Sequence, residues 1–287
     1  MKILITGAFG QLGSALSRRL ENDHTVFRTG RSIPAGQTGM VLDIQNKMMI
    51  QNVIKVTAPD VIIHAAAMTH VDGCEQNPAL AREINIAGVQ HVCESFSGKI
   101  VHLSTDYVFD GTRGPYSELD DINPISTYGE TKLASERILE SHDANHLIIR
   151  GNVIYDFAKH TQASFLNWVV NSLKNKETIR VVDDQFNNPT WTESMADVLA
   201  LAIHADLTGL WHWGDADVLN RFEFAKQIAT KFELDSKLIQ PITTEELNQD
   251  APRPLKSGLK PDKLAHELAI VPPSIDDCLT AIIERIE

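Results

Sequence analysis

Short apolar runs of strand length alternate with longer amphipathic runs through the first half of the chain. The strand-like runs are residues 2–6, 25–29, 60–65 and 99–104. Between the first two, residues 11–22 place apolar side chains on one face of a predicted helix. Such alternation predicts right-handed crossovers and a parallel sheet. The runs 61–63 and 147–149 are apolar on both faces, which predicts a sheet covered by helices on each side.

The second half of the chain is less regular. Strand patterns at 146–150 and 179–182 and helix patterns at 192–205 and 221–232 are separated by loops at 183–192 and 248–261. We therefore predict an α/β fold, a Rossmann-type doubly wound parallel sheet with a smaller C-terminal substrate lobe. The dinucleotide-binding domain is expected in residues 1–150. Residues 151–287 should form mainly the substrate-binding lobe, with about 192–220 returning to the Rossmann domain.

Composition and charge narrow the class of protein. Hydrophobic residues make up 43% and charged residues 22% of the chain, as in ordinary globular proteins. The formal net charge of -12 argues against a nucleic acid partner, because such binders need clustered Lys and Arg. No apolar stretch approaches the roughly 18 residues of a membrane helix. We expect no membrane partner and a cytoplasmic protein.

Cysteine and histidine positions argue against disulfides and metal sites. Cys74, Cys93 and Cys278 are far apart and form no CxxC pair, which is typical of reduced thiols. The histidines form no pair at i, i+4 with acidic partners. We therefore predict no catalytic metal.

Three glycines, Gly7, Gly10 and Gly13, follow the first strand directly and open the first helix. Glycine permits a tight turn, and a helix N-terminus offers free N–H groups and a partial positive charge to a pyrophosphate. This context predicts a dinucleotide site, although glycines needed only for packing are the alternative. The residues expected to contact the dinucleotide here are Gly7, Phe9, Gly10, Gln11 and Leu12.

The segment after the second strand bears on the choice of cofactor. It contains Arg31 and no Asp or Glu, which favours the 2′-phosphate of NADP over the ribose hydroxyls of NAD. NAD stays open, because Arg31 could also be a solvated surface residue. Asp43, followed by Ile44, is expected on the adenine side of the cofactor, unless Asp43 caps the next helix.

Tyr128 and Lys132 stand four residues apart on a predicted helix, so their side chains share one face. An ammonium beside a phenol favours the phenolate, so we expect Lys132 to lower the pKa of Tyr128 and to make it a general acid or base. Thr105 or Ser104, at the C-terminal end of a predicted strand, could donate a hydrogen bond to a substrate carbonyl. Ligands of open α/β sheets bind at that edge.

With these motifs in place, the sequence resembles the extended short-chain dehydrogenase/reductase superfamily and, within it, the dTDP-4-dehydrorhamnose reductase family, over nearly the whole chain. The resemblance rests on the segments TGAFGQLG from Thr6, HAAAMT from His64, STDYVFDG from Ser104, Tyr128 with Lys132, DDQF from Asp183 with Pro189-Thr190, and Arg253-Pro254. It implies reduction, by NADPH or NADH, of the C4 keto group of a nucleotide-linked 6-deoxy sugar. Tyr128 would supply the proton.

The resemblance also implies roles for further residues. Lys132 would bind the nicotinamide ribose, and Asn85 would support the sheet beneath the site. Ala65, Ala66 and Ala67, together with Ser104, would line the path of the cofactor. The residues expected to face the sugar nucleotide are Tyr107, Asn152, Asn188, Thr190 and Arg253, the last as a partner of the diphosphate.

Two departures from the family pattern leave the sugar open. Val153 stands where typical members carry Trp, and Asn187-Asn188 replaces the usual Gly-Ser. The alternatives are a nucleotide-sugar epimerase or dehydratase, and a non-catalytic NADP-binding regulatory subunit. A dehydratase would carry Asp-Glu after the catalytic Thr, whereas Tyr107 follows Asp106 here. A homodimer is also left open.

Overall fold

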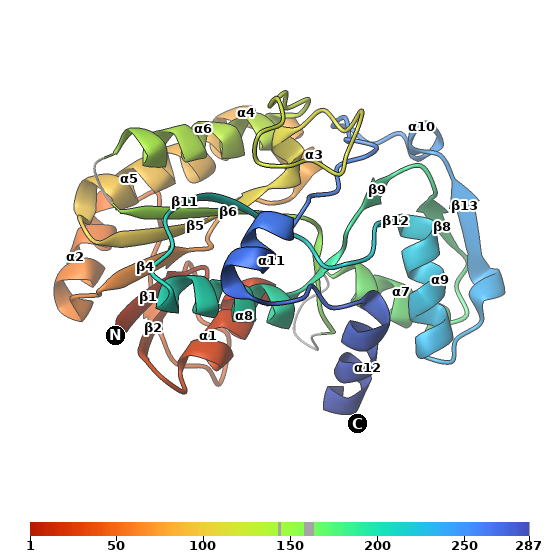
Figure 1. Ribbon diagram of the computed structural model, residues 1–287, viewed down its shortest axis with the longest axis horizontal. Coiled ribbons are helices and arrows are strands. Elements are labelled where there is room, and N and C mark those ends of the chain that lie inside the picture. Colours follow the sequence, from red (N-terminus) through yellow and green to blue (C-terminus); the bar gives the residue numbers. More distant parts are fainter. Residues whose placement is uncertain (143–144, 158–163, 287) are drawn as a thin grey trace.

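The computed structural model describes residues 1–142, 145–157 and 164–286, and in these residues a seven-stranded parallel sheet forms the centre of the molecule (Figure 1). Its order is β11-β6-β5-β4-β1-β2-β3. The strands are β1 (Lys2–Thr6), β2 (Thr25–Gly30), β3 (Met40–Val41), β4 (Val61–His64), β5 (Lys99–Thr105), β6 (His146–Gly151) and β11 (Gly209–Trp213). The strand order reverses between β1 and β4, so their carboxyl ends flank the switch point where dinucleotides bind in such sheets.

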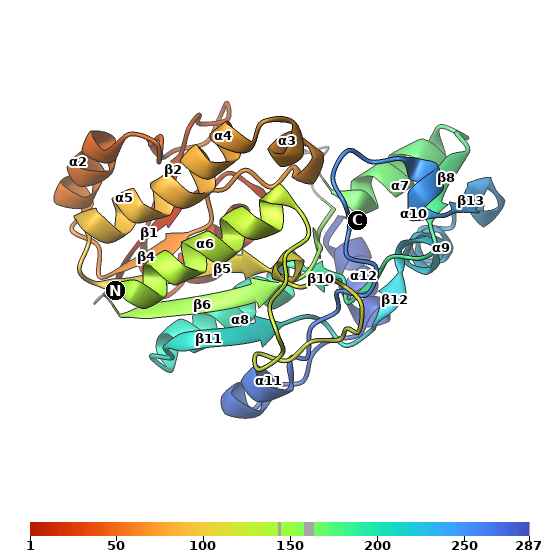
Figure 2. The same cartoon turned by 90° about the horizontal axis from the view of Figure 1, so that it is seen from above.

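Helices cover both faces of this sheet (Figure 1 and Figure 2). One face carries α1 (Gln11–Leu20), α8 (Thr192–His204) and α11 (Asp262–Leu268), and the other carries α2 (Lys47–Thr57), α5 (Gly88–Ser95) and α6 (Thr127–Ser141). Successive side chains of β1 enter opposite cores: Ile3 and Ile5 pack toward α1 and α8, and Leu4 packs toward α2 and α5. The prediction of a doubly wound sheet buried on both faces is therefore confirmed.

Short elements connect the sheet to its surface. They are α3 (Val71–Gln76), α4 (Pro78–Arg82), the π-helical turn η1 (Glu83–Ala87) and the 3-10 turn η2 (Asp106–Val108). Asn85 of η1 holds the coil after β4, because its Oδ1 accepts from the Met68 N–H at 2.8 Å while its Nδ2 donates to Thr131 Oγ1 of α6 at 3.0 Å. The side chain thus joins α6 to the edge of the sheet.

The C-terminal part of the chain has a core of its own, built from α7, α9 and α12. Its helices are α7 (Phe165–Lys174), α9 (Arg221–Lys231), η3 (Ser236–Leu238), α10 (Thr244–Leu247) and α12 (Ile275–Ile286). Three two-stranded pairs accompany them: β7 (Ile154–Tyr155) with β10 (Thr190–Trp191), β9 (Phe186–Asn187) with β12 (Leu219–Asn220), and β8 (Ile179–Val182) with β13 (Ile239–Ile242).

Most predicted elements shift by one or two residues. The first helix ends at Leu20 rather than residue 22, and the short strand β3 has no counterpart in the sequence pattern. After α8 the chain returns to the central sheet, where β11 pairs with β6 in parallel. On this basis we propose to keep the division into residues 1–150 and 151–287, with about 192–220 returning to the first domain.

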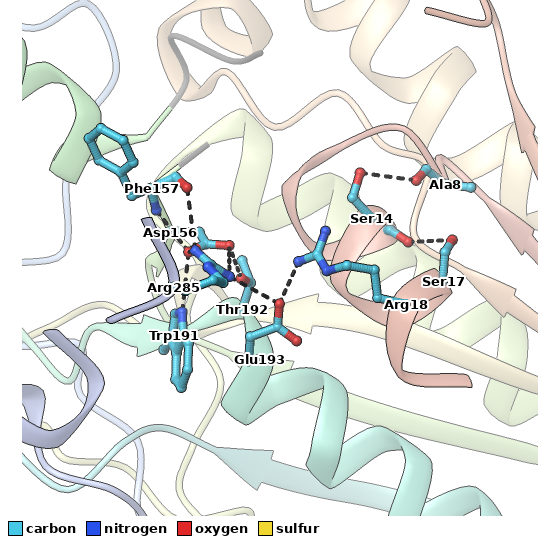
Figure 3. A network of polar contacts seen from close by, with 11 residues as sticks. Ala8, Ser14, Ser17, Arg18, Asp156, Phe157, Trp191, Thr192, Glu193 and Arg285 are labelled. Carbon is cyan, nitrogen blue, oxygen red and sulfur yellow. Dashed lines mark hydrogen bonds and ion pairs between the residues drawn. The ribbon is translucent and has the colours of Figure 1, made fainter. Parts of the chain in front are cut away.

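A network of charged side chains joins the first helix to the last (Figure 3). Arg285 of α12 contacts Asp156. It also contacts Glu193, in the first turn of α8, with 3.2 Å between Arg285 Nη1 and Glu193 Oε1. Glu193 also pairs with Arg18 of α1. Asp156 in turn accepts from Thr192 Oγ1 at 2.8 Å. The two lobes are therefore connected by ion pairs on the side of the sheet that carries α1 and α8.

Candidate active site

The turn after β1 is shaped by glycine. Gly7 has a φ of 70°, and a Cβ atom there would lie 2.8 Å from the backbone nitrogen of Ala66. A Cβ atom at Gly13 would lie 2.2 Å from the carbonyl oxygen of Gly7. Gly10 is the N-cap of α1, and no side chain caps the N–H groups there. The turn therefore leaves close backbone approach and free donors at a helix N-terminus, as a pyrophosphate requires.

The side chains of the same turn fit a polar ligand. The Oε1 atom of Gln11 is buried and lacks a hydrogen-bond partner among the described residues. Phe9 packs over glycines, because a Cβ atom at Gly30 or Gly39 would lie 2.8 or 2.6 Å from its ring. Leu12 packs against the core under α1. An unpaired acceptor beside a glycine cradle fits a dinucleotide, whose hydroxyl groups are donors.

The three alanines after β4 line the switch point. Ala65 N donates to the carbonyl oxygen of Thr6 at 3.2 Å, and Ala66 N donates to Thr6 Oγ1 at 3.3 Å. Ala65, Ala66 and Ala67 are each partly exposed. Their small side chains border the glycine turn without filling the space above it.

The residues assigned to the adenine end lie after β2 and β3. Arg31 is exposed just beyond β2. Asp43 does not cap α2, since the N-cap is Asn46. The Oδ1 atom of Asp43 instead accepts from the Gln45 N–H at 3.0 Å. The side chain of Ile44 is 6% exposed and packs in the core. Arg31 and Asp43 are thus open to a ligand, whereas the Ile44 side chain is not.

The N-terminus of α6 is fixed by three contacts. Ser126 is its N-cap and accepts from the Gly129 N–H at 3.3 Å, while Glu75 accepts from the Thr127 N–H at 3.0 Å. A Cβ atom at Gly129 would lie 2.2 Å from the carbonyl oxygen of Tyr107, so only glycine lets α6 approach η2 this closely. These contacts hold Tyr128 over the carboxyl end of β5.

Thr105 and Ser104 have different hydrogen-bond partners. The Ser104 hydroxyl donates to Glu136 Oε1 of α6, so its proton is already used inside the protein. Thr105 Oγ1 donates its own proton to Asp106 Oδ1 at 3.0 Å, and its hydrogen bond with Tyr128 opposes the rise in the pKa of that phenol. Of the two residues, Thr105 is the one beside Tyr128. Ser104 instead ties β5 to α6.

Tyr128 differs from expectation in its acidity. Burial raises its pKa above the ordinary value, the hydrogen bond with Thr105 opposes this, and the charge of Asp106 adds to it. The expected lowering by Lys132 is not what the structure shows, because the Lys132 ammonium lies 3.1 Å from His102 Nε2. The phenol therefore stays protonated at neutral pH, which is the form that a proton donor needs.

Lys132 itself is almost fully buried, with 4% of its surface exposed. Burial lowers its pKa to about 8, and the nearby carboxylate of Glu136 raises it. It projects from α6 one turn after Tyr128, so the predicted common face holds. A buried amine with this pKa is mostly charged at neutral pH.

Among the predicted substrate residues, Tyr107 and Asn152 face the site. The Tyr107 ring meets the Tyr128 ring edge-on, with centroids 5.6 Å apart. Asn152 Oδ1 is buried without a hydrogen-bond partner in the described part of the chain, while Asn152 Nδ2 donates to Asn188 Oδ1. An unpaired buried acceptor is costly unless a ligand supplies its donor.

Asn188 and Thr190 are placed differently from expectation. Asn188 is 1% exposed; its Nδ2 donates to the carbonyl oxygens of Asp215 and Leu259, each at 3.0 Å. Thr190 is 0% exposed, and its hydroxyl donates to the Asn188 carbonyl oxygen at 3.1 Å. Neither side chain reaches an open surface. Both hold the loops that shape the site, because their polar groups are bonded within the protein.

Arg253 is also committed within the protein. Its Nη2 donates to Asp72 Oδ2 of α3 at 2.7 Å and its Nη1 to the Ala251 carbonyl oxygen at 2.9 Å. Burial raises the pKa of Asp72, but the hydrogen bond from the Ala251 N–H and then the pair with Arg253 lower this pKa below its ordinary value. Arg253 therefore joins the C-terminal lobe to the Rossmann domain, and its charge opposes the rise that burial causes in the pKa of Tyr107.

Sequence reasoning missed Arg221, the first residue of α9. Its Nε donates to Gln185 Oε1 at 3.2 Å and its guanidinium lies 5.6 Å from the centroid of the Phe165 ring. It also hydrogen bonds with Tyr107. Within the described ranges no carboxylate forms an ion pair with it, in contrast to Arg253. Its position at the first residue of the predicted helix 221–232 was the available signal, but the facing element could not be known.

Two negative findings concern the described residues alone. No helix there is both long and apolar enough to cross a membrane. No group of three or more His, Cys, Asp or Glu side chains there could hold a metal ion.

Comparison with known proteins identifies the family. Residues 1–287 match the family described as RmlD substrate binding domain. The chain is 32% identical to dTDP-4-dehydrorhamnose reductase of Aggregatibacter actinomycetemcomitans, with 94% of each chain covered. It is 30% identical to the probable low-salt glycan biosynthesis reductase Agl14 of Haloferax volcanii, with 98% of this chain and 97% of that protein covered.

A solved structure is similar over its whole length. The dTDP-4-dehydrorhamnose reductase of Bacillus anthracis, crystallised in complex with NADP, superimposes with a TM-score of 0.91 at 30% identity and covers 99% of both chains. The UDP-glucose 4-epimerase of Thermus thermophilus, at 20% identity and a TM-score of 0.80, shares the fold. The chain therefore belongs to the dTDP-4-dehydrorhamnose reductase family of the extended short-chain dehydrogenases/reductases.

Proposed function

We propose that this protein reduces the C4 keto group of a nucleotide-linked 6-deoxy sugar with NADPH. The observation that carries the proposal is the arrangement of Thr105, Tyr128 and Lys132 at the carboxyl end of β5, beside the glycine turn. Family membership supports the same reaction, since curated relatives from Aggregatibacter actinomycetemcomitans and Escherichia coli are named dTDP-4-dehydrorhamnose reductase.

The residues of this chain divide the chemistry between them. NADPH, held at the glycine turn of Gly7, Gly10 and Gly13, would supply the hydride for the carbonyl carbon. Tyr128, protonated at neutral pH, would give its proton to the developing alkoxide, and Thr105, whose hydroxyl donates to Asp106, positions the Tyr128 phenol. The charge of Lys132 stabilises the phenolate that remains. Ser104 acts through Glu136 and keeps β5 and α6 in register.

The substrate is proposed to lie between η2 and the N-terminus of α9. Tyr107 and Asn152 border the sugar, and Arg221, which has no ion pair within the described residues, meets the diphosphate. A guanidinium is well suited to phosphate oxygens because its planar N–H groups can bind two of them at once. Arg253, which is paired with Asp72, adds a second positive charge to that of Arg221.

NADPH is the proposed cofactor because Arg31 is exposed beyond β2, where a 2′-phosphate would lie. In Arg31→Ala we expect KM for NADPH to rise about tenfold while KM for NADH stays within about twofold. Steady-state kinetics with both cofactors measure this. Equal changes for the two cofactors would contradict the assignment.

A cytoplasmic location and a homodimer belong to the same proposal, and light scattering tests the dimer.

The decisive experiment follows NADPH absorbance with a panel of dTDP-, UDP-, GDP- and CDP-linked 4-keto sugars. Net NADPH consumption with one of them supports the reductase. Turnover of substrate without net consumption would indicate an epimerase or a dehydratase instead.

Tyr128→Phe should lower kcat by at least about a hundredfold and leave NADPH binding intact. Undiminished reduction by Tyr128→Phe would rule the mechanism out.

A further inference from the structure

A row of polar side chains crosses the sheet beneath the catalytic helix. Thr6 of β1, His64 of β4 and His102 of β5 are register partners on neighbouring strands. Each is no more than 2% exposed, whereas the strand positions before them are Ile5, Ile63 and Val101. Burying polar groups in an apolar sheet costs free energy unless they are paired. The row therefore needs an explanation beyond packing.

Hydrogen-bond distances link this row to Lys132. Thr6 Oγ1 lies 3.1 Å from His64 Nδ1, and the rings of His64 and His102 stack with centroids 5.6 Å apart. His102 Nε2 then lies 3.1 Å from Lys132 Nζ. The row thus ends at the ammonium of the proposed catalytic lysine.

The proton on His102 can be located from its neighbours. Lys132 in its charged form can only donate, so Nε2 must be the acceptor. Ser135 Oγ, 3.0 Å from the same nitrogen, donates its one proton to the Lys132 carbonyl oxygen at 2.6 Å, so it gives no proton to Nε2 and would accept one only from a ring protonated there. We let the contact with the charged Lys132 decide between the two tautomers, which places the His102 proton on Nδ1. That nitrogen is buried and has no partner among the described residues.

We propose that His102 is a positioning residue for Lys132: its bare Nε2 accepts one ammonium proton, which anchors the amine and leaves its other two N–H groups for the site. This inference rests on the proposed function, because it concerns the lysine of that mechanism. In the described part of the chain no second hydrogen-bond partner of Lys132 Nζ is found. The hydrogen bond to His102 Nε2 is therefore the main contact that fixes the position of the Lys132 ammonium.

The charged and titratable groups around this contact keep His102 neutral. Lys132 faces it from α6 and the neutral His64 faces it from β4; burial and then these two neighbours, the Lys132 charge first, hold the pKa of His102 well below its ordinary value. Glu136, one turn further along α6, is paired with Arg150 of β6 and raises the pKa of Lys132. A neutral acceptor next to an ammonium favours the charged form of the amine.

A pair of variants isolates the position of the acceptor. In His102→Gln the amide oxygen can reach the place of Nε2, whereas in His102→Asn it reaches only the place of Nδ1. We expect His102→Asn to move the alkaline limb of the kcat profile about one unit to lower pH, a loss of about fivefold at pH 8, with KM for the sugar nucleotide nearly unchanged. His102→Gln should restore most of the wild-type profile.

The exposed His204 at the end of α8 offers the matched control, since His204→Asn should leave the profile unchanged. If His102→Gln and His102→Asn both retain the wild-type pH profile, the acceptor role is refuted. It is equally refuted if both lose the same fraction of kcat at every pH, because a merely structural histidine would behave in that way.

A measurement on the protein without substrate separates this inference from the proposed function. Nitrogen-15 NMR of the imidazole rings, with His102 assigned by its absence in His102→Gln, reports which nitrogen carries the proton. We expect a neutral ring protonated on Nδ1 between about pH 6 and 8. A ring protonated on Nε2 overturns the inference, even if the enzyme reduces a keto sugar. Failure to reduce any sugar with the expected tautomer present would reject only the proposed function.

Discussion

Glu136 of α6 and Arg150 of β6 form a two-pronged ion pair in the interior, with Arg150 Nη2 2.7 Å from Oε2 and Nε 2.9 Å from Oε1. Both side chains are 1% exposed. Ser104 donates to the same carboxylate, and His212 lies 3.3 Å from Arg150 Nη1. The pair therefore fixes the helix that carries Tyr128 and Lys132 onto the sheet.

Breaking this pair should cost much of the stability. Glu136→Gln removes one charge and leaves the Arg150 guanidinium buried, so we expect a loss of about 3–5 kcal/mol in the free energy of unfolding. Urea unfolding measures it. Glu94→Gln is the control, because its pair with Lys47 is exposed and should be worth less than about 1 kcal/mol. Similar losses in the two variants would contradict the prediction.

The two hydroxyl residues at the end of β5 should separate activity from stability. Thr105→Val should lower kcat about a hundredfold with little change in thermal unfolding, since it removes the hydroxyl beside Tyr128. Ser104→Ala should cost about 1–2 kcal/mol of stability, because Glu136 loses a donor, and should leave kcat within about threefold. Steady-state kinetics and unfolding of both variants measure these effects. If Ser104→Ala lost activity and Thr105→Val lost stability, the roles of the two residues would be exchanged.

Asp106 should make stability depend on pH in an unusual direction. Burial raises its pKa from 3.8 to about 6, against the hydrogen bonds from Ser257 and Thr105. The folded protein then binds more protons than the unfolded chain between these values, so this residue's contribution to stability falls as pH rises from about 4 to about 6. Urea midpoints of wild type and Asp106→Asn across this range isolate the effect, and parallel curves would exclude it.

Arg221 should govern affinity rather than rate. In Arg221→Gln we expect KM for the nucleotide sugar to rise at least about tenfold, with kcat within about threefold and NADPH affinity unchanged. Competition by a nucleoside diphosphate should weaken by the same factor. Arg180→Gln provides the control, because Arg180 is exposed on β8. An unchanged KM would remove Arg221 from the proposed diphosphate site.

The parts of the fold that depend on local pattern were predictable. The alternation of runs indicated the sheet, the glycine spacing indicated the turn after β1, and the spacing of Tyr128 and Lys132 indicated a shared helix face. Each depends on residues close together in the chain. Strand β3, with two residues, is too short to give a pattern.

The remaining features depend on contacts between distant segments. Thr190 matches a family motif and Asn188 departs from it, yet both side chains are buried, and Asn188 is held by the loops near residues 215 and 259. Tyr107 lies 114 residues before Arg221 in the chain. The two side chains face each other only because α9 folds back toward η2. The direction in which Lys132 donates was likewise set by His102, on another element. No local periodicity reports such pairings.

The ion pairs from Arg18 through Glu193 to Arg285 and Asp156 have a practical consequence for protein production. Deleting residues 284–287 would remove Arg285 and leave the buried carboxylate of Asp156 with hydrogen bonds, such as that from Thr192, but without its ion pair. At the other end, Lys2 N donates to Asp60 Oδ2 at 2.7 Å, and β1 follows at once in the middle of the sheet. Affinity tags on either end therefore need a flexible spacer if the recombinant enzyme is to keep its native melting temperature.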